Sequence, residues 1–329
     1  MMRLALIGDI HAYRRFLPPW LLLGKRLLGT TTLWTWRQFL FDQRLLGPVL
    51  NRAASLKPDL LLLSGDVSNT ALPAEFMEVR HTLDALLGTT PALTVPGNHD
   101  RYTRRAQRRR TLEKLLGRYV PGRFPHFQRL RGRWHLLALD AARPYLTSAS
   151  GRLGNDQMEA ARQQVAALTR RDGLIVLCHY PLFYPPGTHH RPRHSLLDKK
   201  RLITLLRGCP ARTLYLHGHV HVPWQFSAPD SALEHLTLIN AGAPTCRTRR
   251  FPQGQGFWQI GLPANPWAGV GLWRHVPARD LTSADNGIPE VGVGVEAKEI
   301  EGWTVTHRTL HPTGRVVVSA HPALQGLPA

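Results

Sequence analysis

The sequence predicts an α/β fold built on a mostly parallel sheet, and three observations lead to this prediction. Short apolar runs bounded by turn residues recur along the chain, as expected for strands that are covered on both faces. Stretches with helical spacing of apolar residues alternate with these runs, which is the rhythm of βαβ units. Several of the runs end in an acidic residue or a histidine, at the position where α/β proteins place their chemistry.

The composition limits the classes of function. With 329 residues, 43% of them hydrophobic and 19% charged, the chain can bury a sizeable core like an ordinary soluble globular protein. A net charge of +20 is unusual, and it predicts attraction to phosphate esters, nucleic acid or an anionic membrane surface. A GC-rich coding sequence is the alternative explanation, because only six of the 42 basic residues are lysines.

Cysteine usage and hydropathy bear on the compartment. The three cysteines show neither a metal-binding spacing nor an even disulfide set, which fits a reducing cytoplasm. The N-terminus lacks the pattern of a secretory signal, and no apolar run approaches the ~18 residues that span a bilayer. The sequence therefore predicts a cytoplasmic protein, with peripheral attachment to the inner membrane as the alternative.

The first expected strand, residues 3–11, contains Asp9 and His11 at its end. Residues two apart in an extended segment point to the same side, so this pair can place a carboxylate and an imidazole on one metal ion. Residues 13–55 follow as a basic insert rich in Trp and Leu. This insert is either a helix lying in an anionic membrane interface or a helical segment whose Arg stems cover apolar surface of the domain.

A strand–helix–strand unit comes next. The Leu-rich run at residues 58–66 predicts a buried strand that ends in Asp66. The amphipathic pattern at residues 73–87 predicts a helix that begins with a proline and has Gly88 after its end. Another short apolar run, residues 92–95, predicts the strand that completes the unit.

The turn at residues 96–100 brings together three polar side chains, those of Asn98, His99 and Asp100. Asn98 can offer an amide oxygen to a metal, His99 can donate a proton, and Asp100 can hold that imidazole in one tautomer. The basic run at residues 101–117 predicts a helix, either as a solvated face or as a feature that draws in an anionic substrate.

The second half of the chain repeats the pattern of strands that end in polar residues. Expected strands cover residues 134–140, 173–181, 211–217, 236–240, 256–261 and 303–310, and expected helices cover residues 155–169 and 196–207. His179 ends the second of these strands, whereas His219 and His221 follow the third, just after Gly218. Asp140 is expected as a turn cap rather than a ligand.

The irregular loop at residues 185–194 supplies further candidate residues. His189, Arg191 and His194 are candidates for contacts with a substrate phosphate, because loops on a rigid scaffold often carry binding residues. The chain is expected to form a single domain over residues 1–312, which contains a long loop at residues 263–289. Residues 313–329 are expected to form a tail.

Seven nitrogen and oxygen donors thus occupy strand-to-loop junctions: Asp9, His11, Asp66, Asn98, His179, His219 and His221. The chain has 17 histidines, so a single one carries little information, but seven donors at the same kind of junction are hard to attribute to chance. Mixed carboxylate, amide and imidazole ligands suit Mn, Fe or Zn rather than a Cys-rich structural zinc site. Seven ligands with one shared is the count for two divalent metal ions.

This set resembles the calcineurin-like metallophosphoesterase superfamily over about residues 3–240. The signature blocks occur in the family's order: Asp9-x-His11, Gly65-Asp66, Gly97-Asn98-His99-Asp100, His179 after a strand, and Gly218-His219-x-His221. The resemblance implies a four-layer α/β/β/α sandwich with the site at its strand ends. It implies that the two metals are held by Asp9, His11, Asp66 and His221 and by Asp66, Asn98, His179 and His219.

The resemblance also implies the chemistry of a metal-dependent phosphoric ester hydrolase. By this resemblance, two bound metals would supply a hydroxide that attacks the phosphorus in line, and His99, oriented by Asp100, would protonate the leaving oxygen. The chain departs from the common pattern at Ala12, where many members have Gly. It also departs at Asn69, where Ser/Thr protein phosphatases carry an Asp that leads into an Arg. The second departure favours the bacterial phosphodiesterase branch.

Several functions remain open within this resemblance. The phosphodiester or pyrophosphate bond belongs either to a soluble cyclic nucleotide or to a lipid-linked substrate of the UDP-2,3-diacylglucosamine type at the membrane. In the second case, residues 13–55 would form the apolar entrance. A nuclease is supported by the net charge alone. A metal-free scaffold predicts a broken ligand set, whereas this set is complete.

Overall fold

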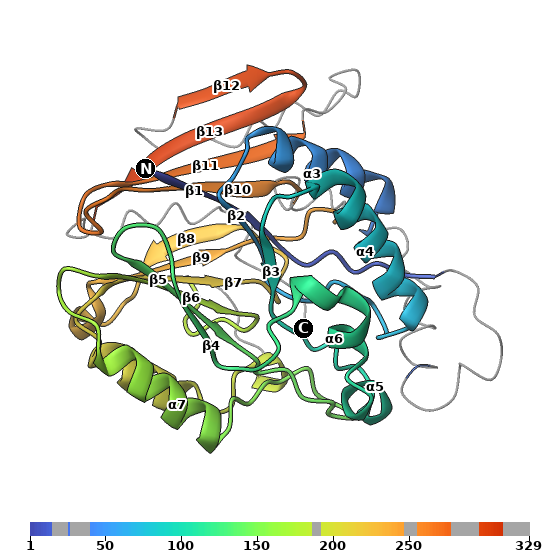
Figure 1. Ribbon diagram of the computed structural model, residues 1–329, viewed down its shortest axis with the longest axis horizontal. Helices are drawn as coiled ribbons and strands as arrows, with labels where there is room; N and C mark the ends of the chain where they lie inside the picture. Colours follow the sequence, from blue (N-terminus) through green and yellow to red (C-terminus); the bar gives the residue numbers. More distant parts are fainter. Residues whose placement is uncertain (15–25, 27–39, 186–191, 247–254, 278–295, 312–329) are drawn as a thin grey trace.

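The computed structural model describes residues 1–14, 26, 40–185, 192–246, 255–277 and 296–311. Within these residues, two β-sheets lie face to face and helices cover their outer sides (Figure 1). The arrangement is the four-layer α/β/β/α sandwich that the family resemblance implies.

The first sheet has seven strands in the order β12-β13-β11-β10-β1-β2-β3. Its parallel part consists of β1 (Met2–Ile7), β2 (Leu60–Leu63) and β3 (Ala92–Thr94). Antiparallel pairing extends this part through β10 (Phe257–Leu262), β11 (Val270–Pro277), β13 (Trp303–Leu310) and β12 (Glu296–Ile300).

The second sheet has six strands in the order β4-β5-β6-β7-β9-β8. Its parallel centre consists of β5 (Trp134–Leu139), β6 (Gly173–Cys178), β7 (Arg212–His217) and β9 (Leu236–Asn240). The antiparallel edges are β4 (His126–Arg129) and β8 (Trp224–Ser227).

The alternation of side chains along β1 shows how the layers are held together. Leu4 and Leu6 are fully buried among the leucines and isoleucines between the two sheets. Ala5 and Ile7 point to the other face and are buried against α3 (Leu46–Ser55) and α4 (Pro73–Leu87). Because successive strand residues face opposite sides, an apolar run with no polar interruption is buried on both faces, as predicted.

The remaining helices are α5 (Arg104–Arg108) and α6 (Thr111–Leu116) beside the first sheet, and α7 (Asn155–Ala166) and α8 (Lys199–Arg207) on the second. The single helix predicted for residues 101–117 is therefore wrong. Arg110 has a left-handed backbone with φ of 50°, which a continuous right-handed helix cannot contain. Helix α7 begins after Gly154 and ends at Ala166, with no side-chain hydrogen bond at its N-cap.

The prediction of a long loop at residues 263–289 is wrong at residues 270–277, which form β11, and residues 278–289 lie outside the described residues. Its Gly and Pro residues suggested a loop, but the strand pairs with β10 on one side and β13 on the other. The sheets are mixed rather than mostly parallel, since six of the eleven pairings between the described strands are antiparallel. The tail from residue 312 onward lies outside the described residues.

Most of the basic insert lies outside the described residues, including residues 15–25 and 27–39. Its described end packs on the domain: Val49 and Leu50 of α3 are fully buried in the core that α3 and α4 form against the first sheet. Among the described residues, no helix is both long and apolar enough to cross a bilayer.

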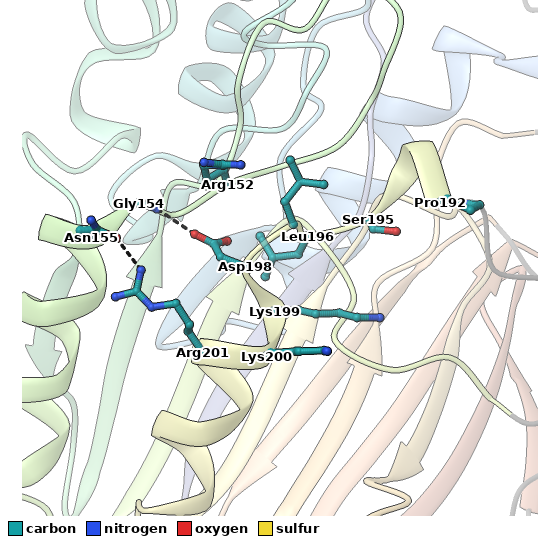
Figure 2. Close-up of a pocket in the computed structure, with 11 residues that line it drawn as sticks. Arg152, Gly154, Asn155, Pro192, Ser195, Leu196, Asp198, Lys199, Lys200 and Arg201 are labelled. Carbon is teal, nitrogen blue, oxygen red and sulfur yellow. Dashed lines mark hydrogen bonds between the residues drawn. The ribbon is translucent and has the colours of Figure 1, made fainter.

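A groove of about 540 Å³ lies between the start of α7 and the start of α8 (Figure 2). Four basic side chains line it, those of Arg152, Lys199, Lys200 and Arg201. None of the seven predicted metal donors borders this groove, so it is separate from the site that the sequence indicates.

Candidate metal centre

All seven predicted donors lie at the carboxyl ends of parallel strands, and both sheets contribute. Asp9 and His11 follow β1, Asp66 follows β2, Asn98 follows β3, His179 follows β6, and His219 and His221 follow β7. Parallel strands end at the same edge of a sheet, and the two sheets face each other, so these turns converge. The structure thus brings together residues that are more than 200 positions apart.

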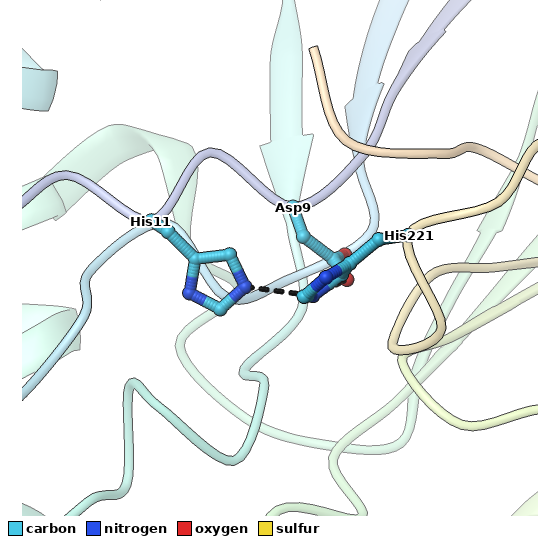
Figure 3. A group of neighbouring side chains, drawn as sticks. All are labelled: Asp9, His11 and His221. Atoms are coloured by element: carbon cyan, nitrogen blue, oxygen red, sulfur yellow. Dashed lines mark hydrogen bonds and ion pairs between the residues drawn. The ribbon is translucent and has the colours of Figure 1, made fainter. Parts of the chain in front are cut away.

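Asp9, His11 and His221 form the first group of converging side chains (Figure 3). Nε2 of His221 lies 3.4 Å from Oδ2 of Asp9 and 2.9 Å from Nε2 of His11. Asp9 is fully buried, and this burial raises the pKa of its carboxyl group well above the ordinary value. A cation between these atoms would supply the positive charge that a buried carboxylate needs.

Asp66, Asn98, His179 and His219 form the second group, around the ring of His179. Nε2 of His179 lies 3.2 Å from Oδ1 of Asn98 and 3.2 Å from Nδ1 of His219. The same nitrogen lies 3.3 Å from Oδ2 of Asp66. Four potential ligand atoms of three chemical kinds therefore face one another in a buried space.

The outer nitrogens of both rings in this group bond to backbone carbonyls. Nδ1 of His179 lies 2.9 Å from the carbonyl oxygen of Ser64, and Nε2 of His219 lies 3.0 Å from that of His194. A carbonyl oxygen can only accept, so these outer nitrogens carry a hydrogen, and in the neutral ring the inward nitrogen has the lone pair. This is the tautomer that metal-binding histidines need, so the residues present fit a metal centre. Burial would lower the pKa of His179, but in the absence of a cation the neighbouring Asp66 carboxylate raises it to about 9, so a metal would replace a proton on its inward nitrogen.

Asp66 lies between the two groups. Its Oδ2 is 3.8 Å from Nε2 of His11 in the first group and 3.3 Å from Nε2 of His179 in the second. Its Oδ1 accepts a hydrogen bond of 2.7 Å from the backbone N–H of His99. Burial alone would raise the pKa of Asp66, but the neighbouring histidines, His179 first, hold it well below the ordinary value. Asp66 therefore has the position of a shared ligand.

Four of the donors have left-handed backbone conformations. The φ angles are 50° for His11, 49° for Asp66, 74° for His219 and 61° for His221. A non-glycine residue in this region costs about 1–3 kcal/mol, and such residues concentrate at functional sites. The turns therefore aim their side chains inward at the expense of stability.

Two motif glycines leave space for the buried carboxylates. A Cβ atom on Gly97 would lie 2.1 Å from Oδ1 of Asp66, and one on Gly218 would lie 2.1 Å from Oδ1 of Asp9. No real side chain tolerates such distances, so the carboxylates can reach the site only because these positions are glycines.

His99 lies beside the two groups with its ring edge-on to that of His11, at 4.6 Å between centroids. Its Nδ1 is 2.5 Å from the carbonyl oxygen of Asn69. This nitrogen therefore carries a hydrogen in every protonation state, and Nε2 is the atom that gains or loses a proton.

Asp100 does not orient His99 as the sequence suggested. Its carboxyl group instead accepts hydrogen bonds from the backbone N–H groups of Gly97 at 2.9 Å, Ser68 at 2.9 Å and Val67 at 3.4 Å. It also accepts from the Ser68 hydroxyl at 3.0 Å. Asp100 therefore ties the turn after β2 to the turn after β3. Three N–H donors at close range attract this carboxyl group more than one imidazole does.

Sequence reasoning missed the groups that orient the donors. The carbonyls of Ser64, Asn69 and His194 hold three rings, and a backbone carbonyl leaves no mark on the residue type. Phe41 was also missed; its ring lies 4.7 Å from that of His11 and covers the first group. A buried aromatic residue at the described end of the insert gives no signal of its own.

The predicted substrate loop is described only in part. His189 and Arg191 lie outside the described residues. His194 is placed next to the second group, where its ring is tilted against that of His219 at 5.5 Å between centroids. Asp140 is a turn cap, as predicted: it accepts from the N–H of Ala142 at 3.0 Å, and it also pairs with Arg101.

Comparison with known proteins agrees with this geometry. Residues 2–223 match the family model of the calcineurin-like phosphoesterases. Over 197 residues the chain is 29% identical to a probable cyclic nucleotide phosphodiesterase of Synechococcus sp. (strain WH7803), which covers 57% of this chain and 69% of that protein. Over 175 residues it is 28% identical to a 3',5'-cyclic-nucleotide phosphodiesterase of Nostoc sp. (strain PCC 7120), covering 53% and 60%. The chain thus matches only part of each relative.

Two solved structures share the fold. A dimetal phosphatase from Danio rerio superposes with a TM-score of 0.56 at 12% identity, over 83% of this chain and 95% of that one. A purple acid phosphatase from yellow lupin seeds gives 0.54 at 14% identity, over 83% and 51%. The family match and the complete set of converging donors lead to one conclusion: this chain belongs to the calcineurin-like phosphoesterases, a family of metal-dependent phosphoric ester hydrolases.

Proposed function

We propose that this protein is a phosphodiesterase that uses two divalent metal ions, with a cyclic nucleotide as the first candidate substrate. The position of Asp66 carries the proposal, because its Oδ2 lies within 4 Å of an imidazole nitrogen in each group. The two relatives named as cyclic nucleotide phosphodiesterases support the choice of substrate.

The ligand assignment follows the two groups of converging side chains. One cation would be held by Asp9, His11, Asp66 and His221, and the other by Asp66, Asn98, His179 and His219. When bound, two such cations neutralise phosphate oxygens and acidify a water molecule. The donor set suits Mn, Fe or Zn.

His99 is the proposed general acid. Its Nδ1 is occupied by the carbonyl of Asn69, so the proton delivered to the leaving oxygen comes from Nε2. The ring lies beside the ligands, 4.6 Å between centroids from that of His11, and one of its nitrogens lies within 4.8 Å of ligand atoms of His11 and Asp66.

A diester or pyrophosphate bond is the proposed target rather than a monoester. The turn after Asp66 reads Val67-Ser68-Asn69 and supplies no arginine for a dianionic terminal phosphate. The lipid-linked alternative depended on residues 13–55, and its apolar entrance falls on residues that the structure does not describe. We propose one domain over residues 1–312 and do not extend the proposal to a lipid or a nucleic acid.

Hydrolysis rates test this function. We expect the Mn-loaded protein to hydrolyse bis-p-nitrophenyl phosphate and cyclic AMP, and to hydrolyse p-nitrophenyl phosphate more slowly. A monoester that is cleaved tenfold faster than the diester would overturn the phosphodiesterase proposal. UDP-2,3-diacylglucosamine in the same series tests the lipid alternative.

A further inference from the structure

The turn from Asn69 to Leu72, between β2 and α4, needs support from outside. Ala71 within it has a left-handed backbone with φ of 56°, which is unfavourable for a residue with a Cβ atom. The turn is buried along its whole length. Its backbone polar groups therefore require partners within the protein.

Glu75, in the first turn of α4, supplies these partners for the N–H groups. Its carboxyl group is 1% exposed and accepts from the N–H of Thr70 at 2.9 Å and from that of Leu72 at 3.0 Å. It also bonds to the hydroxyl of Thr70 at 3.1 Å. The contact to Leu72 is the one that caps the helix, whereas the two contacts to Thr70 hold the turn that precedes it.

Arg26 supplies partners for the carbonyl groups of the same turn. Its guanidinium donates to the carbonyl of Thr70 at 3.3 Å and to that of Ala71 at 3.2 Å. Glu75 thus binds the N–H groups of the turn, and Arg26 binds its carbonyl groups. The charges of Arg26 and Glu75 also attract each other through it.

The other end of the turn reaches the candidate general acid. The carbonyl of Asn69, one residue before Thr70, holds Nδ1 of His99, and the N–H of Asn69 donates to the carbonyl of Ala12 at 2.9 Å. Rotation of the Asn69–Thr70 peptide group would turn this carbonyl away from His99. The contacts that prevent the rotation are those of Glu75 to the N–H and hydroxyl of Thr70.

We propose that Glu75 is a positioning residue for His99, acting through the Asn69–Leu72 turn. This inference rests on the proposed role of His99 as proton donor. Loss of the Glu75 contacts frees the carbonyl of Asn69, and the ring of His99 then loses its fixed tautomer and direction. The metal ligands are untouched by this change.

A proton signal tests the positioning without any activity. The hydrogen on Nδ1 of His99 should give a downfield, exchange-protected resonance in the metal-free protein, identified by its absence in His99→Ala. We expect this resonance to be lost or shifted upfield in Glu75→Leu and kept in Glu75→Gln, whose amide oxygen can still accept both N–H groups. Glu78→Leu, at a partly exposed position on the same helix, is the matched control and should keep it.

Kinetics provide the second readout. Protonation matters for an alkoxide leaving group and little for nitrophenolate, so Glu75→Leu should slow cyclic AMP hydrolysis by roughly 10- to 100-fold and bis-p-nitrophenyl phosphate hydrolysis much less. In the His99→Ala background, Glu75→Leu should cause no further loss, because the two residues act as one unit. Metal content should equal that of the wild type.

The outcomes separate the inference from the proposed function. An unchanged resonance, equal rate losses on both substrates, or full additivity with His99→Ala would overturn the positioning role. A wild-type protein that hydrolyses neither diester overturns the proposed function, and the resonance alone then decides the positioning. If Glu75→Leu does not fold, Arg26→Ala removes the support of the turn from its other side and must shift the same resonance.

Discussion

The metal centre and the Asn69–Leu72 turn are supported in opposite ways. In the metal centre, backbone carbonyls hold side chains, as the carbonyl of Ser64 holds the ring of His179. In the turn, the side chains of Glu75 and Arg26 hold the backbone. The first arrangement brings the metal-binding side chains together, so removing one of these side chains should abolish function. The second holds the backbone of the turn in one conformation, so removing one contact should reduce function only in part.

Asp66→Ala should have the largest effect, because Asp66 lies between both groups of donors. We expect loss of both metals and of diester hydrolysis. Metal analysis of the purified variant checks this. Asp140→Asn is the matched control: it is also an acid at a strand end, but it caps a turn and should keep its metals. An Asp66→Ala protein that retains one full equivalent of metal would show that the two groups are independent.

His99→Ala should keep both metals and lose about 10²–10⁴-fold in rate on a diester with an alkoxide leaving group, the usual range for general acid catalysis. The metal ligands remain in place, so metal content separates this variant from Asp66→Ala. Steady-state rates on cyclic AMP measure the loss. Full activity in this variant would remove His99 from the mechanism.

Gly97→Ala should weaken metal binding without removing a ligand. The new methyl group would overlap Oδ1 of Asp66, so the carboxylate has to leave its position. We expect affinity to fall by roughly 10- to 100-fold, the range typical for changes next to a metal ligand. Gly122→Ala, where an added Cβ meets nothing within 4 Å, should bind metal like the wild type. Equal affinities for both variants would contradict the close approach of Gly97 to Asp66.

Glu75→Gln should change the pH dependence of stability. Burial raises the pKa of Glu75 to about 7, although hydrogen bonds from Leu72 and Thr70 and the nearby charge of Arg26 lower it in part. The native state therefore favours the protonated acid. Its contribution is fully present below the unfolded pKa near 4.5 and is lost as the pH rises through about 7.

Denaturant unfolding at several pH values measures this effect. The stability advantage of the wild type over Glu75→Gln should shrink by roughly 3 kcal/mol between pH 4.5 and 7, from 1.4 kcal/mol per pKa unit. Glu78→Gln, at a partly exposed position on the same helix, should follow the wild type. A difference that stays constant with pH would show that folding does not raise the pKa of Glu75.

The donors of the metal centre could be recognised in the sequence, whereas the Asn69–Leu72 turn and the contacts that support it could not. The seven donors could be found because their residue types carry the chemistry and because each stands after an apolar run. The groups that orient the histidine rings could not be found, because they are the backbone carbonyls of Ser64 and Asn69, and every residue has a backbone carbonyl. The predicted contact of Asp100 with His99 was wrong for the same reason: backbone N–H groups, which the residue types do not reveal, bond to this carboxylate instead.

The fold shows a similar division. Strands that are buried on both faces, such as β1 and β2, were predicted from continuous apolar runs. Strand β11 was missed, because its side chains alternate between buried and half-buried and it lies between proline- and glycine-rich residues. Tertiary pairing with β10 and β13 stabilises it, and local sequence does not report such pairing.

Titration of the metal-free protein with Mn, followed by calorimetry and by diester hydrolysis, tests the central claim most directly. We expect two ions to bind per chain and hydrolysis of bis-p-nitrophenyl phosphate to rise as the second ion binds. Asp66→Ala should bind neither ion in the same experiment. Full activity at one ion per chain, or hydrolysis by the metal-free protein, would contradict the account.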